Sequence, residues 1–221
     1  MGFSSEWDQA FAANTHASVW PWSDLVSYIH RYARPADGYR RVLELGCGIG
    51  ANAPLFLRLG VDYSAVEGSE AAVKKLRERY PQLAEQVVVG DFTKDIPFAG
   101  PFDLVVDRGA ITHNSSEDIV RTLGMIFGRL RPGGKLIGID WFSTDYPDHL
   151  LGEPLDSHTR TRFPSGQFVG LGAVHFSDRA HIIDVLTQAG FGLERLEHKR
   201  SEVMHPSHET RGWWHFVAVK P

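Results

Sequence analysis

The stretch that most constrains this chain is a short apolar strand that runs into a glycine-rich turn and then into an apolar helix. It reads Arg41-Val-Leu-Glu-Leu-Gly-Cys-Gly-Ile-Gly-Ala-Asn52, with glycines at positions 46, 48 and 50. Glycine lets a backbone approach a ligand where a Cβ would collide with it. The helix that follows points its free N–H groups at the occupant of the crevice. Nucleotide-like cofactors bind in this way, so a cofactor enzyme is the first hypothesis.

The rest of the chain alternates apolar strands with helical segments. We predict strands at 41–45, 63–67, 86–90, 102–106 and 134–141, and helices at about 51–59, 69–80, 116–130 and 178–189. Continuous apolar strands indicate a parallel α/β sheet that is covered on both faces. Two further strands, at 190–197 and 213–219, have no helix between them. They predict an antiparallel pair at the edge of the sheet.

Length and composition favour one domain over residues 1–221, because a chain with 43% hydrophobic residues can bury a full core. Residues 1–38 are predicted to form an N-terminal helical lid, since the aromatic residues at 7, 11, 20 and 22 exceed what packing alone requires. Plain packing remains the alternative. The long, polar segment 142–176, interrupted by prolines, is predicted to be a substrate-recognition insertion, with a flexible surface loop as the alternative.

Charge and composition exclude several function classes. The net charge is −4 and no basic stripe is present, so we expect no nucleic-acid partner. We also expect no membrane partner and a cytoplasmic location, because no apolar segment is long enough to cross a bilayer and no signal peptide is visible. The single cysteine, Cys47, excludes an internal disulfide, and no metal site is predicted. The oligomeric state stays open.

The identity of the cofactor depends on the acidic residues around the turn. Gly46–Ala51 fits the dinucleotide fingerprint, and Glu67, at the end of the second strand, would hold a ribose in either case. Glu44, however, lies where the phosphates of a dinucleotide would disfavour a carboxylate. A cofactor with a cationic amino-acid end would be helped by it. Asp91 and Phe92 suit an exocyclic amine and its ring.

The chain at this point resembles the class I S-adenosylmethionine-dependent methyltransferases. The resemblance is carried by five segments over about 41–140: Val42-Leu-Glu-Leu-Gly-Cys-Gly-Ile-Gly50, Glu67, Gly90-Asp91-Phe92, Phe102-Asp-Leu-Val-Val-Asp107 and Leu130-Arg-Pro-Gly-Gly-Lys135. It implies a seven-stranded, mostly parallel sheet in the order 3-2-1-4-5-7-6, with strand 7 antiparallel and helices on both faces. It also implies S-adenosylmethionine as the cofactor.

The resemblance further assigns cofactor-binding positions. Gly46, Cys47 and Gly48 would line the methionine portion, Glu67 with Gly68 beside it would hold the ribose, and Asp91 with Phe92 would receive the adenine. Asp107 would lie beside the methionine amino group and the sulfonium. Arg108 follows it, as in the Asp-Arg-Gly segment of thiopurine-methyltransferase-like members.

Histidines are the candidate catalytic residues, because a hydroxyl acceptor gains from a general base and histidine has the useful pKa. His113 follows the fourth strand, where ligands of parallel sheets bind, and His175 ends the insertion. Structural packing is the alternative for both. Trp20, Trp22 and Arg160 are the candidate substrate-binding residues, and solvated surface charge is the alternative for Arg160.

These observations predict the transfer of a methyl group from S-adenosylmethionine to a small-molecule acceptor. A hydroxyl is the first choice, on a sugar or a natural product, because the chain lacks a basic face and supplies candidate bases. Nitrogen or a protein side chain remains open within the same class. Two alternatives come from other classes: an NAD-dependent oxidoreductase, and a non-catalytic module that binds a cofactor or a partner.

Overall fold

A computed structural model describes residues 5–15, 17–206 and 208–221. Its centre is a seven-stranded sheet in the order β3-β2-β1-β4-β5-β10-β9, as predicted. Strands β1 to β5 run parallel to one another, and β10 is antiparallel to both β5 and β9. The strands are β1 (Arg41–Leu45), β2 (Asp62–Glu67), β3 (Val87–Val89), β4 (Phe102–Arg108), β5 (Leu130–Phe142), β9 (Gly192–Val203) and β10 (Glu209–Val219).

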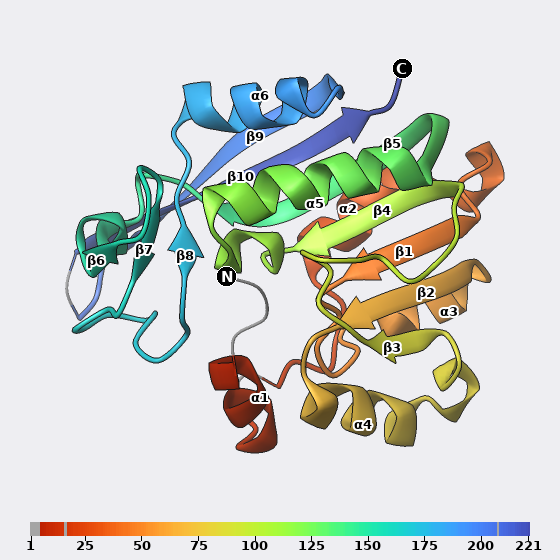
Figure 1. Cartoon of the computed structure of the whole chain (residues 1–221), viewed down its shortest axis with the longest axis horizontal. Coiled ribbons are helices and arrows are strands. Elements are labelled where there is room, and N and C mark those ends of the chain that lie inside the picture. The colour runs from red at the N-terminus through yellow and green to blue at the C-terminus, as the bar shows by residue number, and fades with distance from the viewer. Residues whose placement is uncertain (1–4, 16, 207) are drawn as a thin grey trace.

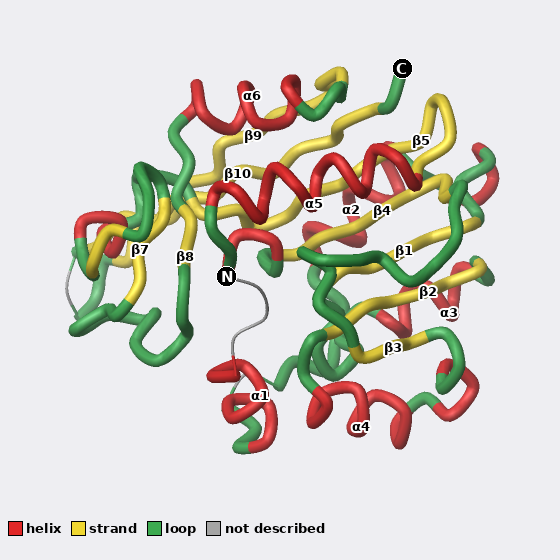
Figure 2. Tube along the Cα trace, in the orientation of Figure 1, coloured by secondary structure: helices red, strands yellow, loops and turns green. Residues whose placement is uncertain are grey.

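Helices cover both faces of the sheet, which confirms the predicted architecture (Figures 1 and 2). Alternating side chains of the strands build the two cores: Val42 packs with α2 to α4, while Leu43 and Leu45 pack with α5 and α6. The helices are α2 (Ser23–Tyr32), α3 (Ala53–Leu59), α4 (Glu70–Arg79), α5 (Ser116–Arg129) and α6 (Arg179–Gln188). Short 3₁₀ turns are η1 (Pro35–Asp37), η2 (Pro81–Leu83) and η3 (Ile111–His113).

One residue near the end of β5 reverses the alternation of that strand. Ile137 and Ile139 pack in the core under α2 to α4, and Trp141 then packs in the opposite core, under α5 and α6. The residue between them, Asp140, adopts a left-handed conformation with φ 57°. An extra residue of this kind is a β-bulge, which re-aims the side chains that follow it.

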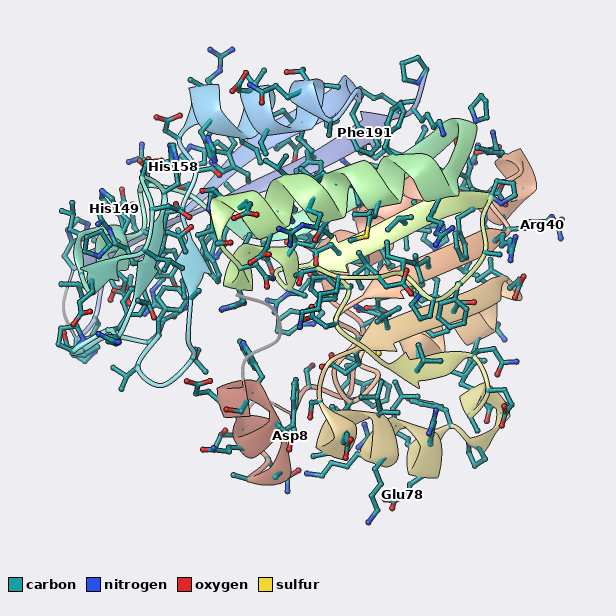
Figure 3. All side chains as sticks on the ribbon, in the orientation of Figure 1. Asp8, Arg40, Glu78, His149, His158 and Phe191 are labelled. Atoms are coloured by element: carbon teal, nitrogen blue, oxygen red, sulfur yellow. The ribbon has the colours of Figure 1, made fainter. Side chains whose placement is uncertain are left out.

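The parallel strands end at one edge of the sheet, where the N-terminal helix and the insertion gather (Figure 1). Helix α1 (Ser5–Ala12) lies beside the start of α4 and is tied to it by Asp8, labelled in Figure 3. The Asp8 carboxylate accepts hydrogen bonds from the Ser69 hydroxyl at 2.6 Å and the Ala71 N–H at 3.1 Å. Lys75 of α4 donates to the Phe11 carbonyl oxygen at 2.5 Å.

The insertion at 142–176 folds around its own apolar core and is not an irregular polar loop. It contains η4 (Pro147–Leu150) and a three-stranded sheet of β6 (Glu153–Pro154), β7 (Thr159–Thr161) and β8 (Val174–His175). The buried cluster consists of Phe142, Tyr146, Phe163, Phe168, Leu171, Val174 and Phe176. The hairpin of β9 and β10 is longer than predicted and reaches toward the insertion (Figure 1). Among the described residues, no helix combines the length and apolarity that crossing a membrane requires.

Candidate functional site

A cavity of about 820 Å³ opens where the parallel strands end, between α1, the insertion and the start of β10. Two parts of its lining differ in chemistry. The glycine side comes from the ends of β1, β2 and β3 and consists of Glu44, Gly46, Gly48, Glu67, Gly68, Asp91 and Phe92. The aromatic side comes from α1, η3, the insertion and β10 and consists of Trp7, His113, Phe142, Tyr146, Phe168 and Trp213. Arg108 and Asp140 lie between them, at the ends of β4 and β5.

Neighbouring groups of the protein already require glycine at two positions of the turn. Gly46 and Gly48 adopt left-handed conformations, with φ of 67° and 53°. A Cβ at Gly46 would lie 2.1 Å from the Cβ of Ala110, and one at Gly48 would lie 3.2 Å from the Phe11 ring. The turn therefore stays free of side chains where the loop after β4 and helix α1 close on it. Its backbone is left to line the cavity.

Glu44 is buried at the floor of the cavity and is held on both oxygens. The Asn52 amide donates to Oε1 at 2.7 Å, and the Tyr63 hydroxyl donates to Oε2 at 2.5 Å. Burial raises the pKa of Glu44 despite these donors. Sequence reasoning found Glu44 but missed Asn52, whose side chain also accepts the Trp22 N–H at 3.3 Å.

Glu67, at the end of β2, fixes the shape of the turn. Its Oε2 accepts the Gly48 N–H at 2.8 Å, and its Oε1 accepts the Ser69 N–H at 2.9 Å. Burial raises the pKa of this carboxyl group. A carboxylate offers about four lone-pair positions, so Glu67 keeps capacity to accept a hydroxyl donor from the cavity.

The remaining predicted positions on the glycine side lie in two loops. Asp91 and Phe92 line the cavity after β3, and Asp91 accepts hydrogen bonds from the N–H and hydroxyl of Thr93 at 3.0 and 2.6 Å. Gly68 lines it after Glu67. Cys47 does not: its thiol is buried in the core beneath the turn, and burial raises its pKa well above the usual value.

Asp107 does not take the place expected of it beside a bound cofactor. It is fully buried, and its Oδ1 accepts the N–H groups of Ala110 and Ile111 at 3.1 and 3.0 Å. Its Oδ2 accepts the Trp141 indole N–H at 2.6 Å. Burial raises its pKa to about 7. The Trp141 ring can reach Asp107 because the bulge at Asp140 turns it to that face. Asp107 therefore anchors the loop that leads to His113.

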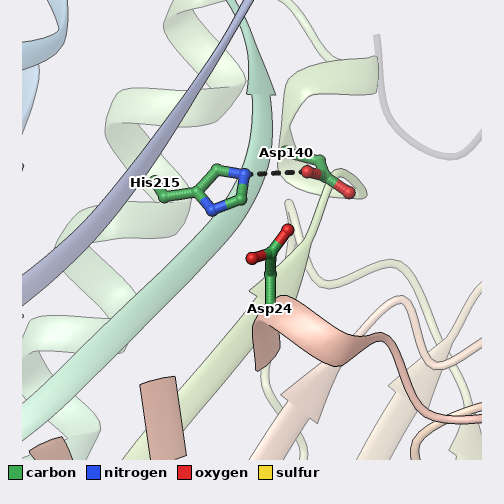
Figure 4. Close-up of side chains that lie close together, drawn as sticks. All are labelled: Asp24, Asp140 and His215. Atoms are coloured by element: carbon green, nitrogen blue, oxygen red, sulfur yellow. Dashed lines mark hydrogen bonds and ion pairs between the residues drawn. The ribbon is translucent and has the colours of Figure 1, made fainter. Parts of the chain in front are cut away.

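Arg108 and Asp140 form an ion-pair network that the sequence did not predict. Arg108 donates to Asp140 Oδ2 from Nε and Nη2, at 2.8 and 2.7 Å, and its guanidinium lies 3.6 Å from the centre of the Trp22 ring. The buried His215 pairs with Asp140 Oδ1 at 2.8 Å (Figure 4). Burial opposes ionisation of Asp140, but His215 and Arg108 outweigh it and hold its pKa below the usual value.

Asp24 of α2 faces this pair, so that ligand-type atoms of Asp24, Asp140 and His215 lie within 4.8 Å of one another (Figure 4). The two carboxylates already have cationic partners, Lys199 for Asp24 and Arg108 for Asp140. A divalent cation would add two positive charges to a balanced cluster. We therefore interpret it as an ion-pair network.

His113 is the predicted catalytic residue that lies in the cavity. Its Nδ1 is 3.3 Å from the Ala173 carbonyl oxygen, so the neutral ring carries its proton on Nδ1 and its basic lone pair on Nε2. The ring is held by aromatic edges: Trp7 at 4.7 Å and Phe142 at 5.7 Å between centroids, both T-shaped. These contacts fix the position of the ring at the border of the aromatic side.

His175 lies elsewhere, in the small sheet of the insertion. It is 1% exposed, and its Nδ1 contacts the Thr159 hydroxyl at 3.0 Å while its Nε2 lies 2.9 Å from His181 Nε2. Burial and the neighbouring His181 lower its pKa to about 3. A ring that does not line the cavity and resists protonation is unsuited to be the base. Its role is structural.

The three predicted substrate residues separate in the structure. Trp22 lines the cavity, but Trp20 is 75% exposed and does not. Arg160 points into the insertion, where its Nε donates to the His149 carbonyl oxygen at 3.1 Å. His149 and His158 lie in the same outlying part of the molecule (Figure 3). The cavity instead receives Arg211 from β10, a residue that lay outside the predicted strand.

Comparison with known proteins agrees with this geometry. A family model described as a methyltransferase domain matches residues 42–134. The cypemycin N-terminal methyltransferase of a Streptomyces species is 32% identical over 116 residues, which cover 52% of this chain and 46% of that protein. The chain thus spans less than half the length of the curated relatives it matches.

Solved structures of the same fold cover nearly the whole chain. An S-adenosylmethionine-dependent methyltransferase from Methanosarcina mazei superposes with a TM-score of 0.68 at 17% identity, over 92% of this chain and 99% of that one. The CcbJ methyltransferase from Streptomyces caelestis gives 0.67 at 18% identity, over 98% of each chain. Residues 42–134 thus match a methyltransferase domain, and the chain as a whole has the fold of S-adenosylmethionine-dependent methyltransferases.

The methyltransferase-domain match and the fold support S-adenosylmethionine, not NAD, as the cofactor. The glycine side fits that group on its own evidence. Two buried carboxylates, Glu44 and Glu67, lie below a turn whose backbone is exposed to the cavity, and Phe92 supplies an aromatic face. A cationic amino-acid end, a ribose and a planar base each meet a suitable partner there.

Proposed function

We propose that this chain transfers a methyl group from S-adenosylmethionine to a hydroxyl group of a small molecule, with His113 as the general base. The observation that carries the proposal is the position of His113. Its Nδ1 is held against the Ala173 carbonyl oxygen, which directs the basic Nε2 away from that bond. The ring lines the cavity between the glycine side and the aromatic side.

Each part of the cavity has a task in this proposal. The cofactor supplies a methyl group that is already activated by the positive charge on sulfur. Glu44 is placed to attract the cationic end of the cofactor, Glu67 to accept the ribose hydroxyls, and Asp91 with Phe92 to hold the adenine. Asp107 holds the loop that carries His113 in place, because it accepts hydrogen bonds from the N–H groups of Ala110 and Ile111. Positioning of this kind is the main source of rate in a displacement whose leaving group is already activated.

We further propose that α1 acts as a lid and that the insertion recognises the acceptor. Trp7 and Phe11 of α1 line the cavity, and polar contacts through Asp8 and Lys75 hold the helix to α4. None of the residues of α1 is fully buried, so this helix can open at a lower cost than the core helices. The insertion contributes Phe142 and Phe168 to the aromatic side.

The experiment is a methyl-transfer assay with S-adenosylmethionine and a panel of small molecules, each in a hydroxyl, amine and thiol version on one carbon skeleton. Product S-adenosylhomocysteine is measured by mass spectrometry. We expect turnover of hydroxyl compounds, lost in His113→Phe, which keeps a ring but removes the base. Turnover of amines or thiols alone would contradict the hydroxyl assignment. Cofactor binding with no turnover of any compound would support a non-catalytic module.

An amine is the second candidate acceptor. The similarity to a protein named cypemycin N-terminal methyltransferase favours it, although that similarity covers 46% of the relative. His113 offers a held imidazole that a hydroxyl acceptor would use as a base, whereas a neutral amine needs no base in order to attack. This arrangement places the amine second.

A further inference from the structure

The aromatic side of the cavity is a continuous wall of rings contributed by separate parts of the chain. Neighbouring rings along the wall have centroids 4.7–6.5 Å apart: Trp7 to His113, His113 to Phe142 and Phe168, Phe168 to Tyr146, and Tyr146 to Trp213. Phe142 also faces Trp213 across the register of β5 and β10. Such a wall offers a large apolar area and quadrupolar faces and edges to a planar ring.

The charged groups beside this wall are already neutralised within the chain. Arg108 pairs with Asp140 at 2.7 Å. Arg211 pairs with Glu209 at 2.6 Å, and Asp148 lies near the same guanidinium. An anionic ligand that approached either arginine would be repelled by its partner, Asp140 or Glu209. A cationic ligand that approached either carboxylate would be repelled by the paired guanidinium. A charged group moved from water into this part of the cavity would therefore lose hydration without an unpaired opposite charge to replace it.

We propose that the aromatic side binds an uncharged aromatic molecule whose phenolic hydroxyl lies against His113. The inference rests on the methyl-transfer function proposed above and names its acceptor class. A sugar is disfavoured, because most of the wall is ring surface and offers few partners for several hydroxyl groups at once. The phenol is favoured over an aliphatic alcohol because a hydroxyl with a pKa of about 10 gives up its proton to imidazole far more readily.

Methyl transfer to the phenol needs only the phenol, the methyl donor and His113. The phenolic oxygen forms a bond to the methyl carbon as the carbon–sulfur bond breaks, and the electron pair of that bond stays on sulfur. The phenolic proton passes to Nε2 of His113 and from there to solvent. The products are the aryl methyl ether and S-adenosylhomocysteine, and neither an oxidant nor a metal ion takes part.

The test is titration calorimetry on the full chain saturated with S-adenosylhomocysteine, with four probes of similar size. These are 2-naphthol, 2-naphthoate, 2-naphthylmethylammonium and the saturated alcohol decahydro-2-naphthol. We expect 2-naphthol to bind at least roughly tenfold more tightly than each of the other three. Tighter or equal binding of the carboxylate, the ammonium compound or the saturated alcohol would overturn the assignment.

Variants locate the binding on the aromatic side. Trp213→Leu should weaken 2-naphthol roughly tenfold, whereas Trp20→Ala, which removes an exposed tryptophan outside the cavity, should not change it. Equal effects of the two variants would place the probe elsewhere and overturn the proposal. The saturating titration with S-adenosylhomocysteine separates the two levels of inference. If that compound binds and 2-naphthol does not, only the acceptor class fails; if S-adenosylhomocysteine itself does not bind, the proposed function fails.

Discussion

The two sides of the cavity are built in different ways. The glycine side is assembled from consecutive segments, each a strand end and the loop after it. Its polar groups bond within a segment or to the next one, as Glu67 does to Ser69 and to Gly48. The aromatic side is assembled from α1, the insertion and β10, which are far apart in the sequence, and ring packing holds it together. The glycine side therefore depends on short stretches of sequence, whereas the aromatic side depends on tertiary packing.

The two sides also carry opposite pH dependences. Burial raises the pKa values of Glu44, Glu67 and Asp107 near the glycine side, so their ionisation as pH rises opposes folding. Behind the aromatic side, burial lowers the pKa values of His175 in the insertion and of His181 in α6, so their protonation as pH falls opposes folding. The cofactor half should tolerate acid better than the acceptor half.

The largest expected effect separates chemistry from donor binding. His113→Ala and His113→Phe should lower kcat by about 10²–10⁴-fold, because the base is lost, while affinity for S-adenosylhomocysteine stays within roughly twofold. Steady-state kinetics and calorimetry measure the two quantities. His30→Ala, at an exposed position on α2, is the matched control. Unchanged turnover in His113→Phe would mean that the reaction uses another base or none.

The second effect addresses the glycine side. Glu67→Ala should reduce affinity for S-adenosylhomocysteine by about 2–3 kcal/mol, roughly 30–150-fold, because the ribose acceptor disappears and the Gly48 N–H loses its partner. Calorimetry gives the affinity. Glu70→Ala removes an exposed carboxylate from the first turn of α4 and serves as the control. An affinity equal to that of the unmodified chain would remove Glu67 from the donor site.

The contrast between the two sides explains what the sequence could predict. Glu44, Glu67, Asp91 and the sheet order follow from patterns that lie within single strand–turn–helix units. Asp107 was misplaced because its partner Trp141 lies 34 positions further on and faces it only through the bulge at Asp140. No spacing rule indicates a left-handed aspartate inside an apolar strand.

The aromatic side was predicted only in part for the same physical reason. The aromatic content of the N-terminal segment and of the insertion was visible, but which rings would meet was not. Trp22 reaches the cavity and Trp20 does not, although both lie beside the same proline. His113 was found because it follows a strand end, whereas Arg211 was missed because β10 begins earlier than its apolar run.

The third effect tests the difference in acid sensitivity. With a pKa of about 3 in the folded state and one near 6.5 in the unfolded chain, His175 binds its proton only after unfolding between those values. Lowering the pH from 7.5 to 5 should therefore remove about 2 kcal/mol of the free energy of unfolding, and His175→Gln should remove that part of the slope. Urea titrations at several pH values measure it.

Hydrogen exchange shows where the acid-sensitive part lies. At pH 5, after correction for intrinsic exchange rates, the amides of β7 and β8 should lose protection before those of β1 and β4. His30→Gln, at an exposed site, should leave the slope unchanged. Simultaneous loss of protection in all four strands would contradict separate stabilities for the two sides.

The smallest effect lies at the boundary between the two sides. The Trp22 backbone N–H donates to Asn52, which holds Glu44, and the Trp22 ring stacks on Arg108, which lies between the two sides of the cavity. Trp22→Ala should raise KM for the acceptor roughly fivefold, which corresponds to about 1 kcal/mol, because the Arg108 guanidinium loses its cation–π contact. The affinity for the cofactor should stay nearly unchanged. Trp20→Ala should change neither by more than about 0.5 kcal/mol, since that side chain is exposed. A loss confined to the stacked ring acts on Arg108 alone. Equal losses of affinity for the cofactor and for the acceptor in Trp22→Ala would therefore mean that the two sides are coupled through this residue.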